Sequence, residues 1–209
     1  LRWAPDAALP EVHKRLAQSG LADMRAEGPE DVTCCPGTTA CSLALTCAPG
    51  LAKQLMEVLS APRYQEDEQL SRLRIKVSGC PDSCGQHHLG DIGFYGCAVH
   101  DSSRLYPAYT MLLGGGVDER GTRLGQPVMK LPARKTPAAT AALLDLYLTQ
   151  RRPGEAFRAF VERVGLEAIR GALAPFTEVS PPSTDIWNFI DWDSTRMYIV
   201  QRGEGECAV

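Results

Sequence analysis

The sequence predicts an α+β fold, and three features of its pattern support this. Strand-like runs lie together in the middle of the chain, at 73–77, 92–99 and 109–113. Apolar residues at helical spacing come before these runs, at 51–59, and after them, at 143–173. No internal repeat and no low-complexity tract interrupts this order. Because the strands are grouped rather than alternating one by one with helices, the pattern favours an α+β domain.

The first third of the chain predicts two helices separated by a loop. Residues 9–20 form a short helix, with a proline in its first turn and a glycine at its end. A loop rich in cysteine occupies 33–47. A second helix follows a Pro-Gly pair and runs as far as Pro62, and the polar stretch 64–72 allows one more helical turn.

The middle third predicts a sheet. Leu73, Ile75 and Val77 alternate with basic residues, which is typical of a strand. Further strands are expected at 92–99, 109–113 and 128–131, with 117–127 as a connecting loop.

The last third predicts three helices and a tail. Thr136 can cap the first helix, with a proline at the first helical position and two arginines near its C-terminal dipole. Two amphipathic helices follow at 157–164 and 166–173. The tail from Ser180 is rich in proline and then in aromatic residues.

The composition is that of an ordinary globular protein and excludes several partners. The chain has 209 residues, of which 44% are hydrophobic and 22% charged. Its net charge of −3 argues against nucleic acid as the main partner. No apolar run approaches the roughly 20 residues that cross a bilayer, so we expect no membrane partner. The chain starts without a secretory signal, which favours a reducing compartment: the cytoplasm, or a plastid in a eukaryote.

Two cysteine pairs are the strongest chemical signal. Cys35 and Cys41 are spaced C-x5-C, and Cys80 and Cys84 are spaced C-x3-C. Each pair lies in a loop rich in Gly, Pro, Ser and Thr, a composition that lets the backbone turn tightly. Four thiolates from two such loops are enough to hold one cubane iron–sulfur cluster, whose sulfides can accept hydrogen bonds from the backbone.

The spacing leaves alternatives open. Cys41 and Cys47 are also spaced C-x5-C, so counting alone does not fix the register. A structural zinc site is the simplest rival, although a five-residue gap is wide for zinc loops. Four disulfides are a further reading of eight cysteines, which the expected reducing compartment disfavours. We expect the spare thiols of Cys34, Cys47 and Cys97 to lie in the core, and Cys207 to lie on the tail.

The residues around the cysteines resemble those of a known family. Residues 31–46 read DVTCCPGTTACSLALT, and residues 78–96 read SGCPDSCGQHHLGDIGFYG. Both segments resemble the cluster loops of the sirohaem-containing nitrite and sulfite reductases. Two later motifs are similar to a strand end and a late helix of that family: Leu112-Leu113-Gly114-Gly115 and Gly154-Glu155-x-Phe157. The resemblance covers nearly the whole chain.

The resemblance implies a fold and a cofactor site. The fold would be a mixed sheet flanked by helices, which is the C-terminal haem- and cluster-binding domain of such a reductase. Cys35, Cys41, Cys80 and Cys84 would bind a 4Fe–4S cluster, and Cys84 would also bridge to the iron of sirohaem. Electrons would pass by this route to the six-electron reduction of nitrite to ammonia or of sulfite to sulfide.

The resemblance also implies partners. The substrate would be nitrite or sulfite, with nitrite slightly favoured because Ser83, Gln86 and the segment 91–94 look more like the nitrite-reducing members. The electron donor would be a ferredoxin or a flavoprotein. Full-length members have two related halves, and the basic residues that grip the substrate lie mostly in the first half. We therefore expect this chain to be a C-terminal part that needs an N-terminal half or a complementary subunit, with no confident catalytic residue of its own.

The same comparison divides the chain into three regions. Residues 1–33 would end a ferredoxin-like half-domain, 34–178 would bind the 4Fe–4S cluster and sirohaem, and 179–209 would be a C-terminal tail. Two readings from other classes remain: an iron–sulfur electron-transfer module without sirohaem, and a zinc-stabilised interaction domain.

Other residues suggest lesser roles. His87 and His88 are expected to pack around the site or lie on the surface. The glycines at 114–116 suggest a tight turn, or a cradle for a propionate. Trp187, Phe189 and Trp192 are expected to pack over the domain or to cover a surface for the electron donor. A basic cluster suggests either a solvated face or contacts to sirohaem carboxylates, and it comprises Arg120, Arg123, Lys130, Arg134 and Lys135.

Overall fold

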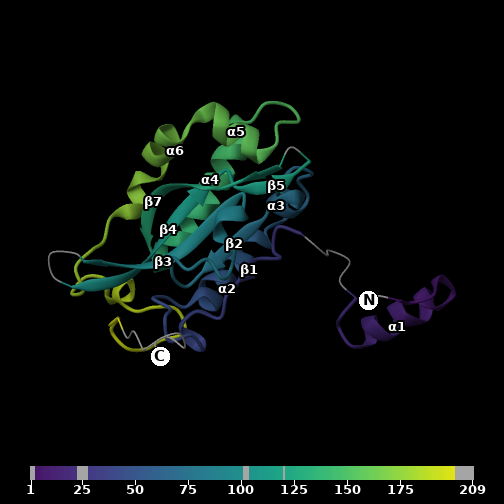
Figure 1. Ribbon diagram of the computed structural model, residues 1–209, viewed down its shortest axis with the longest axis horizontal. Coiled ribbons are helices and arrows are strands. Elements are labelled where there is room, and N and C mark those ends of the chain that lie inside the picture. The colour runs from purple at the N-terminus through teal and green to yellow at the C-terminus, as the bar shows by residue number, and fades with distance from the viewer. Residues whose placement is uncertain (1–2, 23–27, 101–103, 120, 201–209) are drawn as a thin grey trace.

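A five-stranded mixed sheet lies at the centre of the chain (Figure 1). The computed structural model describes residues 3–22, 28–100, 104–119 and 121–200. The sheet has the order β1-β2-β3-β4-β7, in which β1, β2 and β3 are parallel and β4 and β7 are antiparallel to their neighbours. The strands are β1 (Thr33–Cys34), β2 (Ile75–Ser78), β3 (Ile92–His100), β4 (Leu105–Leu113) and β7 (Gln126–Pro132).

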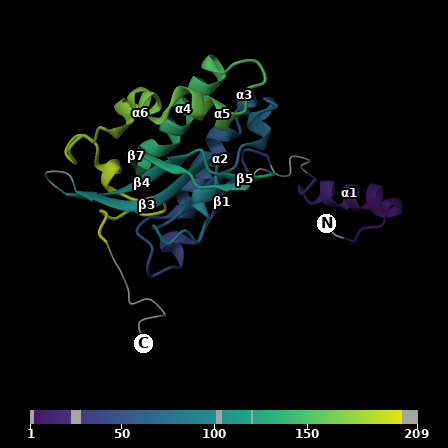
Figure 2. The ribbon, with the colours of Figure 1, turned by 45° about the horizontal axis from the view of Figure 1, so that its top comes forward.

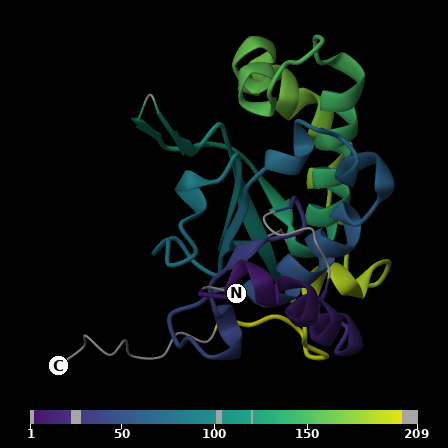
Figure 3. The ribbon, with the colours of Figure 1, turned by 90° about the vertical axis from the view of Figure 1, so that its right-hand side faces the viewer.

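Helices pack on one face of this sheet and enclose the core (Figure 3). α2 and α4 contact each other, and α6 lies against β7. Their apolar faces are fully buried, as the fractional exposures of Leu51, Leu55, Leu143 and Leu144 show. The arrangement is therefore a sheet layer and a helix layer around one core. The helices are α2 (Ala48–Leu59), α3 (Pro62–Gln65), α4 (Thr136–Gln150), α5 (Phe157–Val164) and α6 (Leu166–Leu173).

The first helix, α1 (Leu9–Gln18), stands apart from the sheet and its helices (Figures 1 and 2). Its sequence is amphipathic, yet none of its residues is buried. An amphipathic helix is stable when its apolar face is covered. The described residues do not cover that face, and the division at residue 33 stays a prediction.

The predicted α+β fold with a mixed sheet is confirmed, and the boundaries differ in a few places. Residues 117–127 are not a plain loop, because β5 (Gly116–Asp118) and β6 (Gly121–Arg123) pair there as a hairpin. Thr136 does not cap α4: its hydroxyl donates to the carbonyl of Pro132, and Lys135 holds the cap position. The second predicted helix ends at Leu59 rather than at Pro62, which instead begins α3.

Within the described ranges, no helix combines the length and the apolar character that crossing a membrane requires.

Candidate functional site

Both cysteine loops leave the sheet at the same edge. β1 and β2 are parallel neighbours, with Cys34 opposite Val77. Cys35 follows β1 directly, and Cys80 follows β2 after one glycine. The carboxyl ends of parallel strands meet at one edge of a sheet, which is where α/β proteins commonly bind ligands. The topology therefore brings together two loops that are distant in the sequence.

Gly79 joins the two loops. Its carbonyl accepts hydrogen bonds from the N–H groups of Leu45 (2.9 Å) and Thr46 (3.0 Å), at the end of the first loop. Its own N–H donates to Cys35 Sγ at 3.1 Å. A Cβ at residue 79 would lie 2.7 Å from the carbonyl oxygen of Thr46 and 2.8 Å from Gly37 Cα. The junction thus has room only for glycine.

The four predicted ligands differ in their exposure to solvent. Cys35 and Cys80 are buried, Cys41 is half-buried and Cys84 is exposed. Burial raises the pKa of Cys80, and the carboxylate of Asp82 and then the nearby Cys35 add to that rise. The four thiols thus range from the core, through the half-buried Cys41, to the solvent-exposed Cys84. The N–H that Gly79 donates to Cys35 Sγ is the kind of bond that stabilises a ligating thiolate.

The second loop is closed by its own neighbours. Ser78 Oγ accepts the N–H of Gly85 at 3.1 Å and is hydrogen-bonded to His87 Nδ1 at 2.8 Å. Ser83 and Gln86 have positive φ, which turns the chain back on itself. Ser78, which precedes Cys80, is therefore bonded to both Gly85 and His87, which follow Cys84.

His87 is fully buried, and its second ring nitrogen, Nε2, has no hydrogen-bond partner among the described residues. Its ring lies 4.2 Å from that of His88 and 4.9 Å from that of Tyr95. Burial, and then His88, lowers the pKa of His87 to about 4, so the ring is neutral at neutral pH. The prediction that His87 packs around the site is therefore supported, and the alternative of a place on the surface is wrong for this residue.

The first loop is held from outside by the C-terminal segment. The carboxylate of Asp191 accepts the N–H of Cys47 at 2.8 Å, and the hydroxyl of Tyr198 donates to the carbonyl of Leu45 at 2.8 Å. A cavity of about 900 Å³ remains between the loop and this segment, with Cys41 in its wall. No local pattern pointed to Asp191 as a partner of this loop, because Asp191 lies 144 residues after Cys47.

The spare cysteines lie in three environments. Cys47 is buried, as predicted, and its thiol faces the carboxylate of Asp193 at 3.6 Å. Burial raises the pKa of Cys47 to about 11, which disfavours a thiolate there. The core prediction is wrong for Cys34, which is exposed because β1 is an edge strand, and Cys97 is only half-buried. Cys207 lies outside the described residues.

The predicted basic cluster is dispersed. Arg123 forms an ion pair with Glu162, and Lys135 donates to the carbonyl of Glu178. Arg134 donates from Nε and Nη2 to the carbonyls of Ile190 and Asp191. Arg120 lies outside the described residues, and Lys130 lies on β7.

The glycine run and the tail aromatics have structural surroundings. Gly114 has φ +83° at the end of β4, and a Cβ on Gly115 would meet the carbonyls of His88 and Gly90. The tight-turn reading therefore accounts for the glycines. Phe189 is buried and Trp192 packs against the core, whereas Trp187 is exposed.

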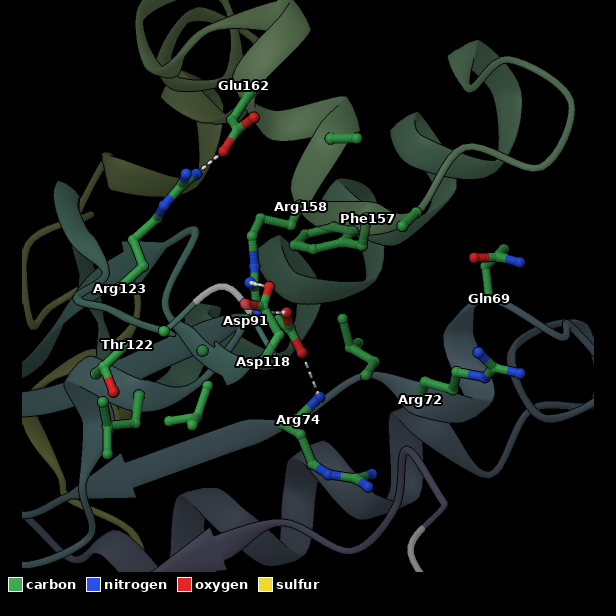
Figure 4. Close-up of a pocket in the computed structure, with 17 residues that line it drawn as sticks. Gln69, Arg72, Arg74, Asp91, Asp118, Thr122, Arg123, Phe157, Arg158 and Glu162 are labelled. Carbon is green, nitrogen blue, oxygen red and sulfur yellow. Dashed lines mark hydrogen bonds and ion pairs between the residues drawn. The ribbon is translucent and has the colours of Figure 1, made fainter.

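A second cavity, of about 770 Å³, lies at the other edge of the sheet (Figure 4). Arg74 directly precedes β2 and Asp91 directly precedes β3, and both line this groove. The groove therefore lies at the amino ends of the strands, opposite the cysteine loops. The guanidinium of Arg158 lies 2.8 Å from Asp118 and 3.5 Å from Asp91. Figure 4 shows these charges turned toward one another, so the groove carries ion pairs rather than one dominant charge.

No three Cys, His, Asp or Glu side chains within the described residues surround a point that would suit a single metal ion. A structural zinc ion needs four ligands at about 2.0–2.3 Å around one centre. The thiolates of a cubane each bind a different iron and are spaced more widely.

Comparison with known proteins identifies the family of the chain. Residues 26–178 match the family described as the nitrite and sulphite reductase 4Fe-4S domain. The assimilatory ferredoxin-dependent nitrite reductase of Haloferax mediterranei is 30% identical over 141 residues, which are 68% of this chain and 24% of that protein. The hemoprotein beta-component of an NADPH sulfite reductase from Methylobacterium nodulans is 33% identical over 139 residues, covering 64% and 21%.

The fold is also that of a solved structure. The NirA protein of Mycobacterium tuberculosis aligns with a TM-score of 0.66 and 23% identity, over 79% of this chain and 31% of that one. The chain spans about a quarter of the length of the curated relatives named above, at 24% and 21%. The match of the family model over most of the chain shows that the chain belongs to the nitrite and sulphite reductase 4Fe-4S domain family.

Proposed function

We propose that this chain is the cluster-carrying part of an assimilatory nitrite or sulfite reductase. Cys35, Cys41, Cys80 and Cys84 hold a 4Fe–4S cluster, and Cys84 also ligates the iron of sirohaem. When bound, these two cofactors supply the one-electron steps of the six-electron reduction of nitrite to ammonia or of sulfite to sulfide. Nitrite is the favoured substrate, on the residues of the second loop.

The observation that carries this proposal is the junction at Gly79. One residue there links the ends of two cysteine loops and donates its N–H to Cys35 Sγ. Such a bond stabilises negative charge on a thiolate that ligates iron. The buried pair, Cys35 and Cys80, would fix the inner side of the cluster.

The surroundings of the two candidates for the second ligand of the first loop, Cys41 and Cys47, support one of the two registers. Cys47 is buried at the start of α2, and its thiol faces a carboxylate. Cys41 is partly open at the tip of the loop, where its N–H donates to the carbonyl of Gly37 at 2.9 Å. The surroundings of Cys41 favour a ligand, and those of Cys47 do not.

Cys84 is suited to a bridging role because it is exposed while its loop is held by Ser78. An exposed thiolate can bind a second metal outside the protein core. The other half of the enzyme, as further chain or as a subunit, supplies the substrate-binding residues. A ferredoxin or a flavoprotein supplies the electrons, and the protein works in a reducing compartment such as the cytoplasm.

An absorption spectrum of the anaerobically purified protein tests the proposal. Sirohaem and cluster together give a strong Soret band with bands in the red. A broad brown shoulder without a Soret band would instead support an electron-transfer module. A colourless protein that contains zinc would overturn the assignment.

The bridging role has its own test. Replacing Cys84→Ser removes the shared thiolate, so we expect the magnetic coupling between haem and cluster to disappear from the spin-resonance spectrum. Cys97→Ser is the matched control, since Cys97 lies outside both loops and contacts Thr110. Coupling that survives Cys84→Ser would refute the bridge.

A further inference from the structure

The last described segment of the chain crosses the end of the first cysteine loop. We call residues 190–198 the C-terminal strap; it is drawn in yellow beside that loop in Figure 1. It holds the loop at two points, through Asp191 on the N–H of Cys47 and through Tyr198 on the carbonyl of Leu45. Thr46, which lies between Leu45 and Cys47, donates its N–H to the carbonyl of Gly79. The end of the first loop is thus clamped between the strap and the second loop.

The strap is itself firmly attached. Arg134 donates to the carbonyls of Ile190 (3.0 Å) and Asp191 (2.9 Å), and its guanidinium lies 4.2 Å from the ring centroid of Trp192. At the other end, the N–H of Tyr198 donates to the carbonyl of Phe189 at 2.7 Å. A segment fixed at both ends can transmit its position to the loop that it contacts.

Asp191 is the unusual residue of the strap. Asp191 is buried, with only 7% of its surface exposed. Burying a carboxylate costs free energy unless the carboxylate is well paired. Its two oxygens accept N–H groups, from Cys47 and from Trp192, both at 2.8 Å. It also lies at the N-terminus of α2, where the helix dipole favours a negative charge. Through the bond to Cys47, the carboxylate of Asp191 holds the end of the first cysteine loop.

Helix α2 is shaped for the strap. Gly50, in its first turn, lies against the side chain of Trp192, and a Cβ there would collide with Trp192 Cβ. The carboxylate of Asp193 also lies near this turn, against the thiol of Cys47. Close approach at a glycine indicates a specific seat for the strap rather than loose coverage.

We propose that the C-terminal strap fixes the first cysteine loop in its cluster-binding conformation, with Asp191 as the positioning residue. The proposal rests on the proposed function, because it assumes that Cys41 ligates a cluster. Asp191 acts through the backbone of residues 45–47 and does not touch the cluster.

The first experiment uses the full chain without a cluster. Hydrogen exchange is measured at the N–H of Cys47 in wild type, Asp191→Ala and Asp191→Asn. We expect exchange to rise about tenfold in Asp191→Ala, as expected for the loss of one charge-assisted hydrogen bond. Asp191→Asn keeps one acceptor oxygen for the N–H of Cys47 but loses the charge and turns its NH2 toward the N–H of Trp192, so its exchange should lie between those of wild type and Asp191→Ala. Unchanged exchange in Asp191→Ala would overturn the proposal whether or not the chain binds a cluster.

The second experiment measures cluster release. The reconstituted full chain is mixed with an iron chelator, and the loss of cluster absorbance is followed at a fixed interval below each variant's unfolding temperature. We expect release about tenfold faster in Asp191→Ala, and an intermediate rate in Tyr198→Phe, which loses a single hydrogen bond. Leu143→Ala is the matched control, since it weakens the buried core away from the strap.

The outcomes separate the two proposals. Equal release by Asp191→Ala and Leu143→Ala would overturn the strap and leave the cluster assignment intact. A wild-type chain that takes up no iron and sulfide would overturn the proposed function, while the exchange data would still test the strap.

Discussion

The two cysteine loops start at neighbouring strands but are held in different ways. The second loop is closed by residues that flank it, since Ser78 before Cys80 bonds to Gly85 and His87 after Cys84. The first loop has a bond of its own, from the N–H of Thr38 to the carbonyl of Thr46 at 3.2 Å, but its end also depends on partners far away in the sequence: Gly79 from the other loop and Asp191 from the strap, 144 residues beyond Cys47.

The difference concerns how each loop is stabilised. A local contact closes a short loop at little entropic cost, whereas a distant contact forms only after the rest of the chain has folded. The second loop should therefore keep its shape under changes that disturb the first. Cys80 and Cys84 of the second loop should then keep their relative positions even if the first loop opens.

The largest effect is expected where the two loops meet. Gly79→Ala puts a Cβ 2.7 Å from the carbonyl oxygen of Thr46 and 2.8 Å from Gly37 Cα, so backbone must move. We expect a loss of about 3 kcal/mol in the free energy of unfolding and no stable cluster, measured by denaturation and by iron content. Gly171→Ala, on open helix surface in α6, is the control and should be neutral or stabilising. A Gly79→Ala protein as stable as wild type would contradict the junction.

A pH-dependent effect is expected in the second loop. The pKa of His87 is lowered to about 4, so between pH 6.5 and 4 the unfolded chain binds a proton that the folded chain does not. The free energy of unfolding should therefore decrease as the pH is lowered through this range, by up to about 3 kcal/mol, because each unit of pKa difference contributes about 1.4 kcal/mol. The contribution is fully present above pH 6.5. His87→Gln should flatten the fall in a series of denaturant titrations, and parallel profiles for the two proteins would refute this.

A smaller effect is expected from the hydroxyl that closes the second loop. Ser78→Ala leaves the N–H of Gly85 without its acceptor in a buried position, at a cost of about 1–2 kcal/mol in unfolding free energy. Ser78→Thr keeps the hydroxyl and is the matched variant. Hydrogen exchange should rise at Gly85 and stay unchanged at Cys47. Equal changes at both amides would mean that the two loops are not independent.

Much of the fold could be predicted from the sequence, because the pattern of apolar residues is set by local geometry. Helical spacing located α2, α5 and α6, and apolar runs located β3 and β7. The hairpin of β5 and β6 was missed because residues 116–123 are polar and rich in glycine, with no apolar alternation. β4 was predicted too short, since its first residues carry less apolar character than its buried end.

The site was predictable only in part, for the same reason. The cysteine spacing and the residues around it are local and pointed to the loops, and the four ligands stay a prediction. Ser78 carries no signal of its own, and its role became visible only with the fold. Asp191 is one of several acidic residues in the tail, and only packing distinguishes it.

The contact between Asp191 and Cys47 also has a consequence for biosynthesis. A ribosome adds about 5–20 residues per second, so roughly 7–30 s pass between the synthesis of these two residues, which are 144 positions apart. Both cysteine loops are complete well before the end of that interval, and the residue that fastens the first one is then still missing. A nascent chain would therefore expose a reactive thiol loop to oxidants and stray metals until Asp191 emerges, and stable cluster insertion is expected only after that point.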